Sequence, residues 1–241
     1  MSLWDFLFPP VCPHCGASVA TQGDWCETCF NDLLHIRHVP HKFLHYVDDV
    51  CVLADYRGGL KSMIYDVKFN EKKEQSKGAA PFLASYNLRM HDYRPHYVIP
   101  IPSSAEKKKV RGYNQVELFF YDWVFSFSNS NRIDGRISDD SVNGVMEYNT
   151  EKEVCYKWFD CLYKMDTHKE MWSLSGSERH STIDKAFMWK ETCDFSLLYD
   201  KRILLVDDIF TTGATLESAA RILRAYHPQY IEALTLASGS F

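Results

Sequence analysis

Apolar positions along the chain alternate between the spacing of strands and the spacing of helices. Residues 59–69 place Leu60, Met63, Ile64 and Val67 three and four positions apart, which predicts a helix with one apolar face. The same criteria predict further helices at 79–90, 114–127 and 216–226, and strands at 50–56, 97–102, 186–189, 202–206 and 230–237. Strands that alternate with helices predict an α/β fold with a parallel sheet flanked by helices.

Two stretches depart from this pattern. Residues 128–165 begin with a polar run that indicates a loop, with a strand possible at 154–163, and residues 164–182 are rich in Ser and predict a mobile loop. Residues 1–45 show little periodicity and hold two cysteine pairs and half of the histidines. The chain therefore divides into a small metal-binding segment, 1–45, and an α/β domain, 46–241.

The composition bounds the class of protein. Of the 241 residues, 46% are hydrophobic and 15% aromatic, enough to bury a sizeable core. The net charge of −5 leaves only a local patch for any nucleic-acid contact. No apolar run reaches the roughly 18 residues of a membrane helix, and the first ten residues lack the basic start of a secretory signal. A cytoplasmic protein without a membrane span is expected.

Four cysteines predict a zinc site. Cys12 and Cys15 form one CxxC pair, Cys26 and Cys29 form a second, and two such knuckles suit a tetrahedral structural Zn²⁺. A redox role for the first pair would need a strand before it, and position 12 leaves no room for one. The segment is too small for a core of its own, so metal binding should supply much of its folding energy. The histidines here are expected in solvated loops rather than at a second metal, and the remaining cysteines as plain thiols.

The clearest functional element spans residues 202–226. A continuous apolar run at 203–206 predicts a strand covered on both faces, and Asp207 and Asp208 follow at its carboxyl end. A short loop then leads into an amphipathic helix. In open α/β sheets ligands bind outside the carboxyl ends of the strands, so this is the expected site.

The order of residues in that element indicates what binds. A loop entering a helix offers unpaired N–H groups to a phosphate, and glycine permits a close approach of the backbone. Two adjacent carboxylates suit a pair of ribose hydroxyls or Mg²⁺ with its waters. A ribose-5-phosphate site is therefore predicted, with the phosphate held by Thr211, Thr212, Gly213, Ala214 and Thr215.

Two other interpretations compete. An ordinary strand–turn–helix with solvated acids would leave the coincidence of the acids, the glycine and three threonines unexplained. A response-regulator receiver also has paired acids after a strand, but its phosphoacceptor lies a further strand later, and too little chain follows Asp208.

A second element, 98–117, predicts an anion site. A strand ending in prolines leads into a polar turn that carries Lys107, Lys108, Lys109 and Arg111, and a helix is expected to start near Asn114. Cations beside a helix start suit a diphosphate. Lys107 alone is expected in a solvated turn, and Lys68 is a further candidate for the diphosphate.

These motifs resemble a known family. The run 206–215 is similar to the phosphoribosyl-diphosphate (PRPP) motif of type I phosphoribosyltransferases. The four cysteines, Lys68-Phe69, the prolines at 100 and 102, and Arg111-Gly112-Tyr113-Asn114-Gln115 resemble, in order, those of ComF-type competence proteins. The resemblance implies that Asp207, Asp208 and Arg111 are catalytic and that Lys108 and Lys109 help to bind PRPP.

Two functions from different classes follow. One is a phosphoribosyltransferase that uses PRPP with Mg²⁺ and transfers the phosphoribosyl group to a nitrogen nucleophile. The other is a non-catalytic accessory protein of DNA uptake that contacts protein partners or single-stranded DNA. The family's mobile loop carries a Gln and an Asn that are not found here, where Glu178-Arg179 match and Thr182 replaces Asn. This difference favours the second function. A PRPP-binding transcriptional regulator would need a DNA-reading helix, which is not evident.

Overall fold

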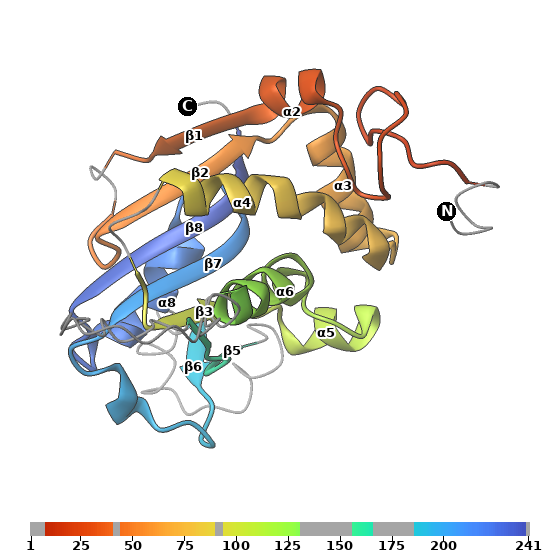
Figure 1. Cartoon of the computed structure of the whole chain (residues 1–241). Helices are drawn as coiled ribbons and strands as arrows, with labels where there is room; N and C mark the ends of the chain where they lie inside the picture. Colours follow the sequence, from red (N-terminus) through yellow and green to blue (C-terminus); the bar gives the residue numbers. More distant parts are fainter. Residues whose placement is uncertain (1–7, 41–43, 90–93, 131–155, 166–185, 240–241) are drawn as a thin grey trace, which may run out of the picture.

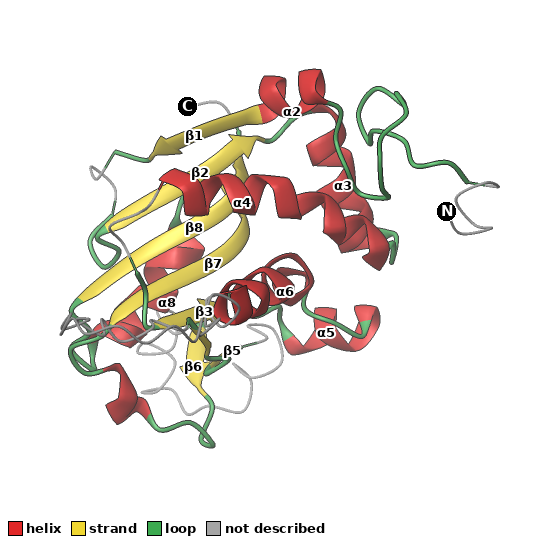
Figure 2. Ribbon diagram, viewed as in Figure 1, coloured by secondary structure: helices red, strands yellow, loops and turns green. Residues whose placement is uncertain are grey.

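A six-stranded sheet forms the centre of the protein in the computed structural model, which describes residues 8–40, 44–89, 94–130, 156–165 and 186–239 (Figures 1 and 2). The strand order is β1-β2-β8-β7-β3-β4, and all neighbours are parallel except β1 and β2. The strands are β1 Leu34–His38, β2 Asp49–Asp55, β3 Tyr97–Pro100, β4 Lys157–Trp158, β7 Arg202–Phe210 and β8 Tyr230–Ser238. The predicted parallel α/β fold is confirmed.

Helices cover both faces of the sheet (Figure 1). On one face lie α3 (Gly58–Phe69), α4 (Ala80–Arg89) and α6 (Gln115–Ser130), and on the other lies α8 (Ala214–Arg224). The remaining elements are α2 Glu27–Leu33, η2 Lys73–Ala79, α5 Ala105–Arg111, η4 Phe195–Leu198 and the antiparallel pair of β5 Leu162–Lys164 with β6 Phe187–Trp189. None of the described helices has the length and apolar character to cross a membrane.

Each face of the sheet has its own buried cluster. Leu204 and Val206 of β7 pack with α3, α4 and α6, whereas Ile203 and Leu205 pack with α8 and the β5–β6 pair. Successive side chains of a strand point to opposite faces, which is why the continuous apolar run of β7 feeds both clusters.

Several elements differ from the sequence-based predictions. The strand expected to stop at residue 206 continues to Phe210, because β8 pairs with it as far as Ser238. The lysine run lies on the helix α5, whose start Ser104 caps, and not in a turn. The strand expected at 154–163 is divided into β4 and β5 by a turn in which Cys161 N donates to Phe159 O. Predictions for 164–182, including Glu178, Arg179 and Thr182, fall almost wholly outside the described residues.

The N-terminal segment packs against the α/β core. It contains α2 and β1, although the sequence showed little periodicity there, and β1 adds an antiparallel edge strand to β2. Trp25, Cys29 and Leu33 are buried in the same cluster as α3 and α4. Contacts of this kind join the two parts into one continuous core. The division between residues 45 and 46 stays a prediction.

A buried carboxyl group lies within β8, away from the carboxyl edge of the sheet. Glu232 is 1% exposed and accepts a hydrogen bond of 2.9 Å from the Tyr86 hydroxyl. Burial raises the pKa of Glu232 to about 8, and the nearby Asp49 adds to the rise while the Tyr86 bond opposes it. The carboxyl group is therefore protonated in the folded protein at a pH where the unfolded chain has lost that proton.

This difference predicts a pH-dependent stability. The stabilising contribution is full below the unfolded pKa of about 4.3 and is lost as pH rises toward the folded pKa. Between about pH 5 and about pH 8 the free energy of unfolding should fall by at most about 4 kcal/mol through Glu232, at about 1.4 kcal/mol per pKa unit. Glu232→Gln should remove this fall in urea denaturation. Equal pH dependence in the two proteins would contradict the assignment.

Candidate functional site

The two acids predicted to hold ribose lie in the last part of β7. Asp208 is buried, Asp207 is half-buried, and the Asp208 N–H donates to Asp207 Oδ1 at 2.8 Å. Both residues are held in register by β8, where Thr235 stands beside Asp207. The carboxylates are therefore fixed by the sheet itself and not by a loop.

Asp208 forms an ion pair with a lysine of α3. The Lys68 Nζ lies 2.9 Å from Asp208 Oδ1, and the side chains are 18% and 4% exposed. The other oxygen, Oδ2, is buried and has no hydrogen-bond partner among the described residues. An unpaired buried acceptor costs about 1–3 kcal/mol, so a donor that arrives here would be bound favourably. A ribose hydroxyl and a metal-bound water are both such donors.

Asp207 is influenced by two lysines, Lys68 and Lys164. Burial raises the pKa of Asp207, and the charge of Asp208 adds to the rise, while Lys68 and Lys164 oppose it. Lys164 belongs to β5 and places its Nζ 5.4 Å from the centre of the Phe187 ring. Burial lowers the pKa of Lys164, Lys107 lowers it further, and Asp207 opposes this. Lys68 thus acts on both carboxylates, and Lys164 adds a second cation that acts on Asp207.

The loop that follows β7 leads directly into α8. Thr211, Thr212 and Ala214 are exposed, and Thr215 lies in the first turn of α8. Gly213 occupies the N-cap position of α8 with a φ of +79°, a conformation that favours glycine, and it has no side chain that could accept a capping hydrogen bond. The Ala214 N–H makes a long bond of 3.4 Å to Thr212 Oγ1 within the loop, and the N–H groups of the first helical turn have no carbonyl partner within the helix, so they are available to an anion.

Gly213 also leaves little room for a side chain. A Cβ at this position would lie 3.1 Å from Leu44 Cδ2 and 3.2 Å from the Phe210 ring. Leu44 belongs to the connection between β1 and β2, where Glu217 of α8 accepts hydrogen bonds from the N–H groups of residues 45–47. The connection thus holds the start of α8 in place.

The RGYNQ residues mainly support the site. The buried Asn114 donates to Ile101 O at 3.2 Å, and Tyr113 donates its hydroxyl to Val67 O at 2.6 Å. Arg111 donates to Gln115 Oε1 at 2.9 Å, and its guanidinium lies 5.1 Å over the ring of Phe69. Gly112 ends α5 with a φ of +77°. This segment therefore ties β3, α3 and α6 together.

The structure brings some of the predicted residues together and leaves others apart. Asp207, Asp208 and the loop 211–215 form one continuous edge, and Lys68 reaches it. Lys108 lies 4.0 Å from Glu117, and Lys109 is exposed on α5. No contact of Lys108, Lys109 or Arg111 with the two acids is found among the described residues. Sequence reasoning missed Lys164, because it lies in the least legible part of the chain.

The four cysteines of the N-terminal segment converge. The sulfurs of Cys12, Cys15, Cys26 and Cys29 all lie within 4.8 Å of one another. The first knuckle is closed by the bond from Gly16 N to Cys12 O, and Cys26 caps α2. Four thiols at such spacing fit a tetrahedral Zn²⁺ with no open position, the arrangement of a structural site.

Comparison with known proteins agrees with both parts of this description. Residues 3–40 match the family model of a double zinc ribbon domain, and residues 167–240 match that of a phosphoribosyl transferase domain. The chain is also 24% identical over 238 residues to Competence protein F of Haemophilus influenzae, covering 95% of this chain and 84% of that protein. The chain is ComF-like.

In the part of this ComF-like protein that the structure describes, one set of four cysteines could hold zinc. The matched model describes a double ribbon, but the four cysteines at 12–29 are the only such cluster among the described residues. Structural zinc is supported by the match and by the convergence of the four sulfurs. The phosphoribosyl transferase match includes β7, the loop 211–215 and α8, which are the elements that form the edge described above.

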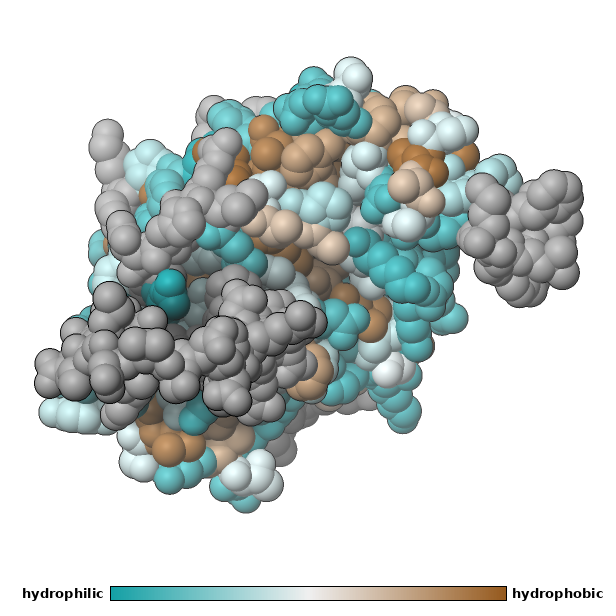
Figure 3. Space-filling view, viewed as in Figure 1, coloured by the Kyte–Doolittle hydropathy of each residue, from teal (hydrophilic) through white to brown (hydrophobic). Residues whose placement is uncertain are grey.

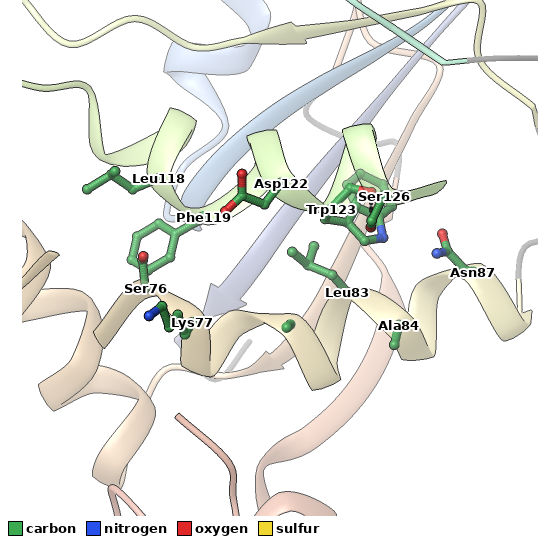
Figure 4. Close-up of a pocket in the computed structure, with 11 residues that line it drawn as sticks. Ser76, Lys77, Leu83, Ala84, Asn87, Leu118, Phe119, Asp122, Trp123 and Ser126 are labelled. Atoms are coloured by element: carbon green, nitrogen blue, oxygen red, sulfur yellow. Dashed lines mark hydrogen bonds between the residues drawn. The ribbon is translucent and has the colours of Figure 1, made fainter. Parts of the chain in front are cut away.

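The ComF-like protein has a hollow between two of the helices that cover the sheet. It measures about 480 Å³ between α4 and α6, with Leu83, Phe119 and Trp123 in its walls (Figure 4). Figure 3 shows hydrophobic residues exposed in the same region between the two helices. None of the predicted site residues lines it. The candidate site is therefore assigned by the chemistry of the carboxylates and the loop and not by the size of a cavity.

The ion pair of Lys68 and Asp208 predicts a large stability effect. Lys68→Met leaves a buried carboxylate without its cation, so the free energy of unfolding should fall by about 3 kcal/mol. Lys72→Met, which breaks the exposed pair with Asp66, should cost less than about 1 kcal/mol. The double variant Lys68→Met/Asp208→Asn should recover most of the loss in chemical denaturation. Equal costs for the two lysines would refute a buried pair.

Proposed function

We propose that this protein binds PRPP together with Mg²⁺ at the carboxyl edge of β7. The observation that supports this most strongly is the junction of two fixed carboxylates with a helix start whose N-cap residue is a glycine, within the region that matches a phosphoribosyl transferase domain. Acceptors for a ribose diol at 207 and 208 come shortly before donors for a phosphate at 211–215, which is the order of groups along ribose 5-phosphate.

In this proposal the 5-phosphate lies against the loop 211–215. The N–H groups at the start of α8 donate to it, and the hydroxyls of Thr211, Thr212 and Thr215 add further donors. Gly213 lets the backbone approach closely. The diphosphate lies toward Lys68 and Lys164, the cations that act on the two acids, with Arg111, Lys108 and Lys109 as further candidates at the rim.

Asp207 and Asp208 would hold the ribose hydroxyls and Mg²⁺. The residues fit that ion, because carboxylate oxygens are the ligands it prefers and Asp208 Oδ2 lacks a partner among the described residues. When bound, Mg²⁺ would supply charge neutralisation for the diphosphate. The carboxylates orient the ribose and lie close to its ring carbon C1.

We further propose that the bound PRPP is a donor in phosphoribosyl transfer. The bond between C1 and the diphosphate oxygen breaks, its electron pair leaves with diphosphate, and the lone pair of a nitrogen nucleophile forms the new bond to C1. That nitrogen loses its proton to water. Positive charge that develops on the ribose ring is stabilised by Asp207 and Asp208, and electrostatic positioning of this kind is usually the largest contribution to such a rate.

The similarity to Competence protein F supports a role in DNA uptake. One surface of the protein favours the alternative of a non-catalytic accessory protein. Tyr65 and Phe69 of α3 are 50% and 59% exposed with ring centres 4.8 Å apart, and Arg111 lies over Phe69. Exposed aromatic rings with nearby cations are typical of surfaces that stack single-stranded nucleic acid. An accessory protein that binds PRPP or a nucleotide and contacts single-stranded DNA here would need no catalysis.

Calorimetric titration of the zinc-loaded protein with PRPP and Mg²⁺ tests the proposed site. The wild type should bind, and Asp207→Asn/Asp208→Asn should lose about tenfold or more in affinity, because two charge-assisted contacts are removed. Asp122→Asn, an exposed acid on α6, is the matched control and should bind as the wild type does.

The outcomes separate the proposals. Circular dichroism and thermal melting must first show that the double variant is folded. PRPP binding that the double variant retains would contradict the assignment of the acids. Binding without release of diphosphate in the presence of a panel of bases and amines would favour the accessory role over the transferase.

A further inference from the structure

The first cysteine knuckle sits directly on the start of α3. The Gly59 N–H donates to Nδ1 of His14 at 2.9 Å, and His14 lies between the ligands Cys12 and Cys15. A Cβ on Gly59 would lie 2.7 Å from His14 Cα, and one on Gly58 would lie 2.5 Å from the imidazole ring. A side chain at either glycine would therefore clash with His14, so only glycine lets the start of α3 lie this close to it. Figure 1 shows the N-terminal segment beside this helix.

Other contacts hold the same end of α3. Arg57, which precedes the helix, donates to Asp32 of α2 at 2.8 Å. Cys29, Trp25 and the α3 residue Met63 belong to one buried cluster. The indole N–H of Trp25 donates to Gly78 O at 2.9 Å. These contacts tie the cysteine-bearing segment to α3 and to η2, the element that follows α3.

The opposite end of α3 enters the candidate site. Lys68 lies in the last turn of the helix and pairs with Asp208 at 2.9 Å. Val67 O accepts the hydroxyl of Tyr113 at 2.6 Å, which ties the same turn to the RGYNQ segment. A helix of twelve residues spans about 18 Å and moves as a unit, so a displacement at His14 is carried to Lys68.

We propose that His14 is a positioning residue for the phosphoribosyl site and acts through α3 on Lys68. The four-cysteine site fixes the knuckle, the knuckle fixes the start of α3, and α3 places the Lys68 ammonium beside Asp208. Misplacement of about 1 Å in such a site can cost about 100-fold, so a small shift of α3 has a measurable effect. The inference rests on the proposed PRPP site, and it gives the metal-binding segment a role in that site without contact with the ligand.

The test is a double-mutant cycle on PRPP affinity in the full-length, zinc-loaded protein. His14→Ala should weaken PRPP binding about fivefold or more while the zinc content stays that of the wild type. His14→Asn should restore binding, because its amide oxygen can accept the Gly59 N–H where Nδ1 did. In a Lys68→Met background His14→Ala should have no further effect on affinity, since the residue acts through Lys68.

Two further variants keep the test decisive. Gly59→Ala disturbs the same contact from the helix side and should also weaken PRPP binding. His35→Ala, an exposed histidine of β1, is the matched control and should bind PRPP as the wild type does. Unchanged affinity in both His14→Ala and Gly59→Ala, or equal losses with and without Lys68, would overturn the inference. Failure of the wild type to bind PRPP would instead overturn the proposed function, and the inference with it.

Discussion

A buried carboxylate within a parallel sheet needs a cation close to it, and Asp208 forms its ion pair with Lys68. Moving a charge out of water costs several kcal/mol, which is offset only when the partner is close and well aligned. Asp208 is 3% exposed, and the pair is 2.9 Å long. Everything that places Lys68 therefore contributes to the site: the apolar face of α3, the bond from Tyr113, and the cysteine segment that holds the start of the helix.

The same edge of the sheet explains why the acids act as a pair without being equivalent. Asp208 pairs with Lys68 of α3, whereas Asp207 is influenced both by Lys68 and by Lys164, which belongs to the β5–β6 pair packed on the other face. Burial and the neighbouring charge of Asp208 raise the pKa of Asp207. A ligand that brings hydroxyl donors and a divalent cation would satisfy both carboxylates at once, which is the electrostatic basis of the proposed PRPP site.

Much of the fold and of the site follows from the sequence, because the strongest signals are local. The apolar run before Asp207, the glycine at 213 and the amphipathic α8 place the strand, the loop and the helix with little help from the rest of the chain. The spacing of the four cysteines likewise predicts that their sulfur atoms converge, as they do in the structure. The helical face of α3 was predicted for the same reason, and its spacing matches the residues that the structure buries.

The parts that were missed depend on contacts between distant segments. Lys164 has no motif around it, and only the pairing of β5 with β6 brings its charge close to Asp207. The continuation of β7 to Phe210 is imposed by β8, and the contact of His14 with Gly59 joins residues far apart in the chain. The lysines at 107–109 were expected in a turn because a run of charged residues is typical of an exposed loop. In the structure Ser104 caps a short helix at this position and Gly112 ends it.

A crystal structure of the zinc-loaded protein with PRPP and Mg²⁺ would test the central claim most directly. The proposed site predicts that the 5-phosphate lies against the N–H groups of residues 211–215 and that the ribose hydroxyls face Asp207 and Asp208, with Lys68 within reach of the diphosphate. PRPP bound elsewhere, with the acids and the loop free of ligand, would contradict the assignment.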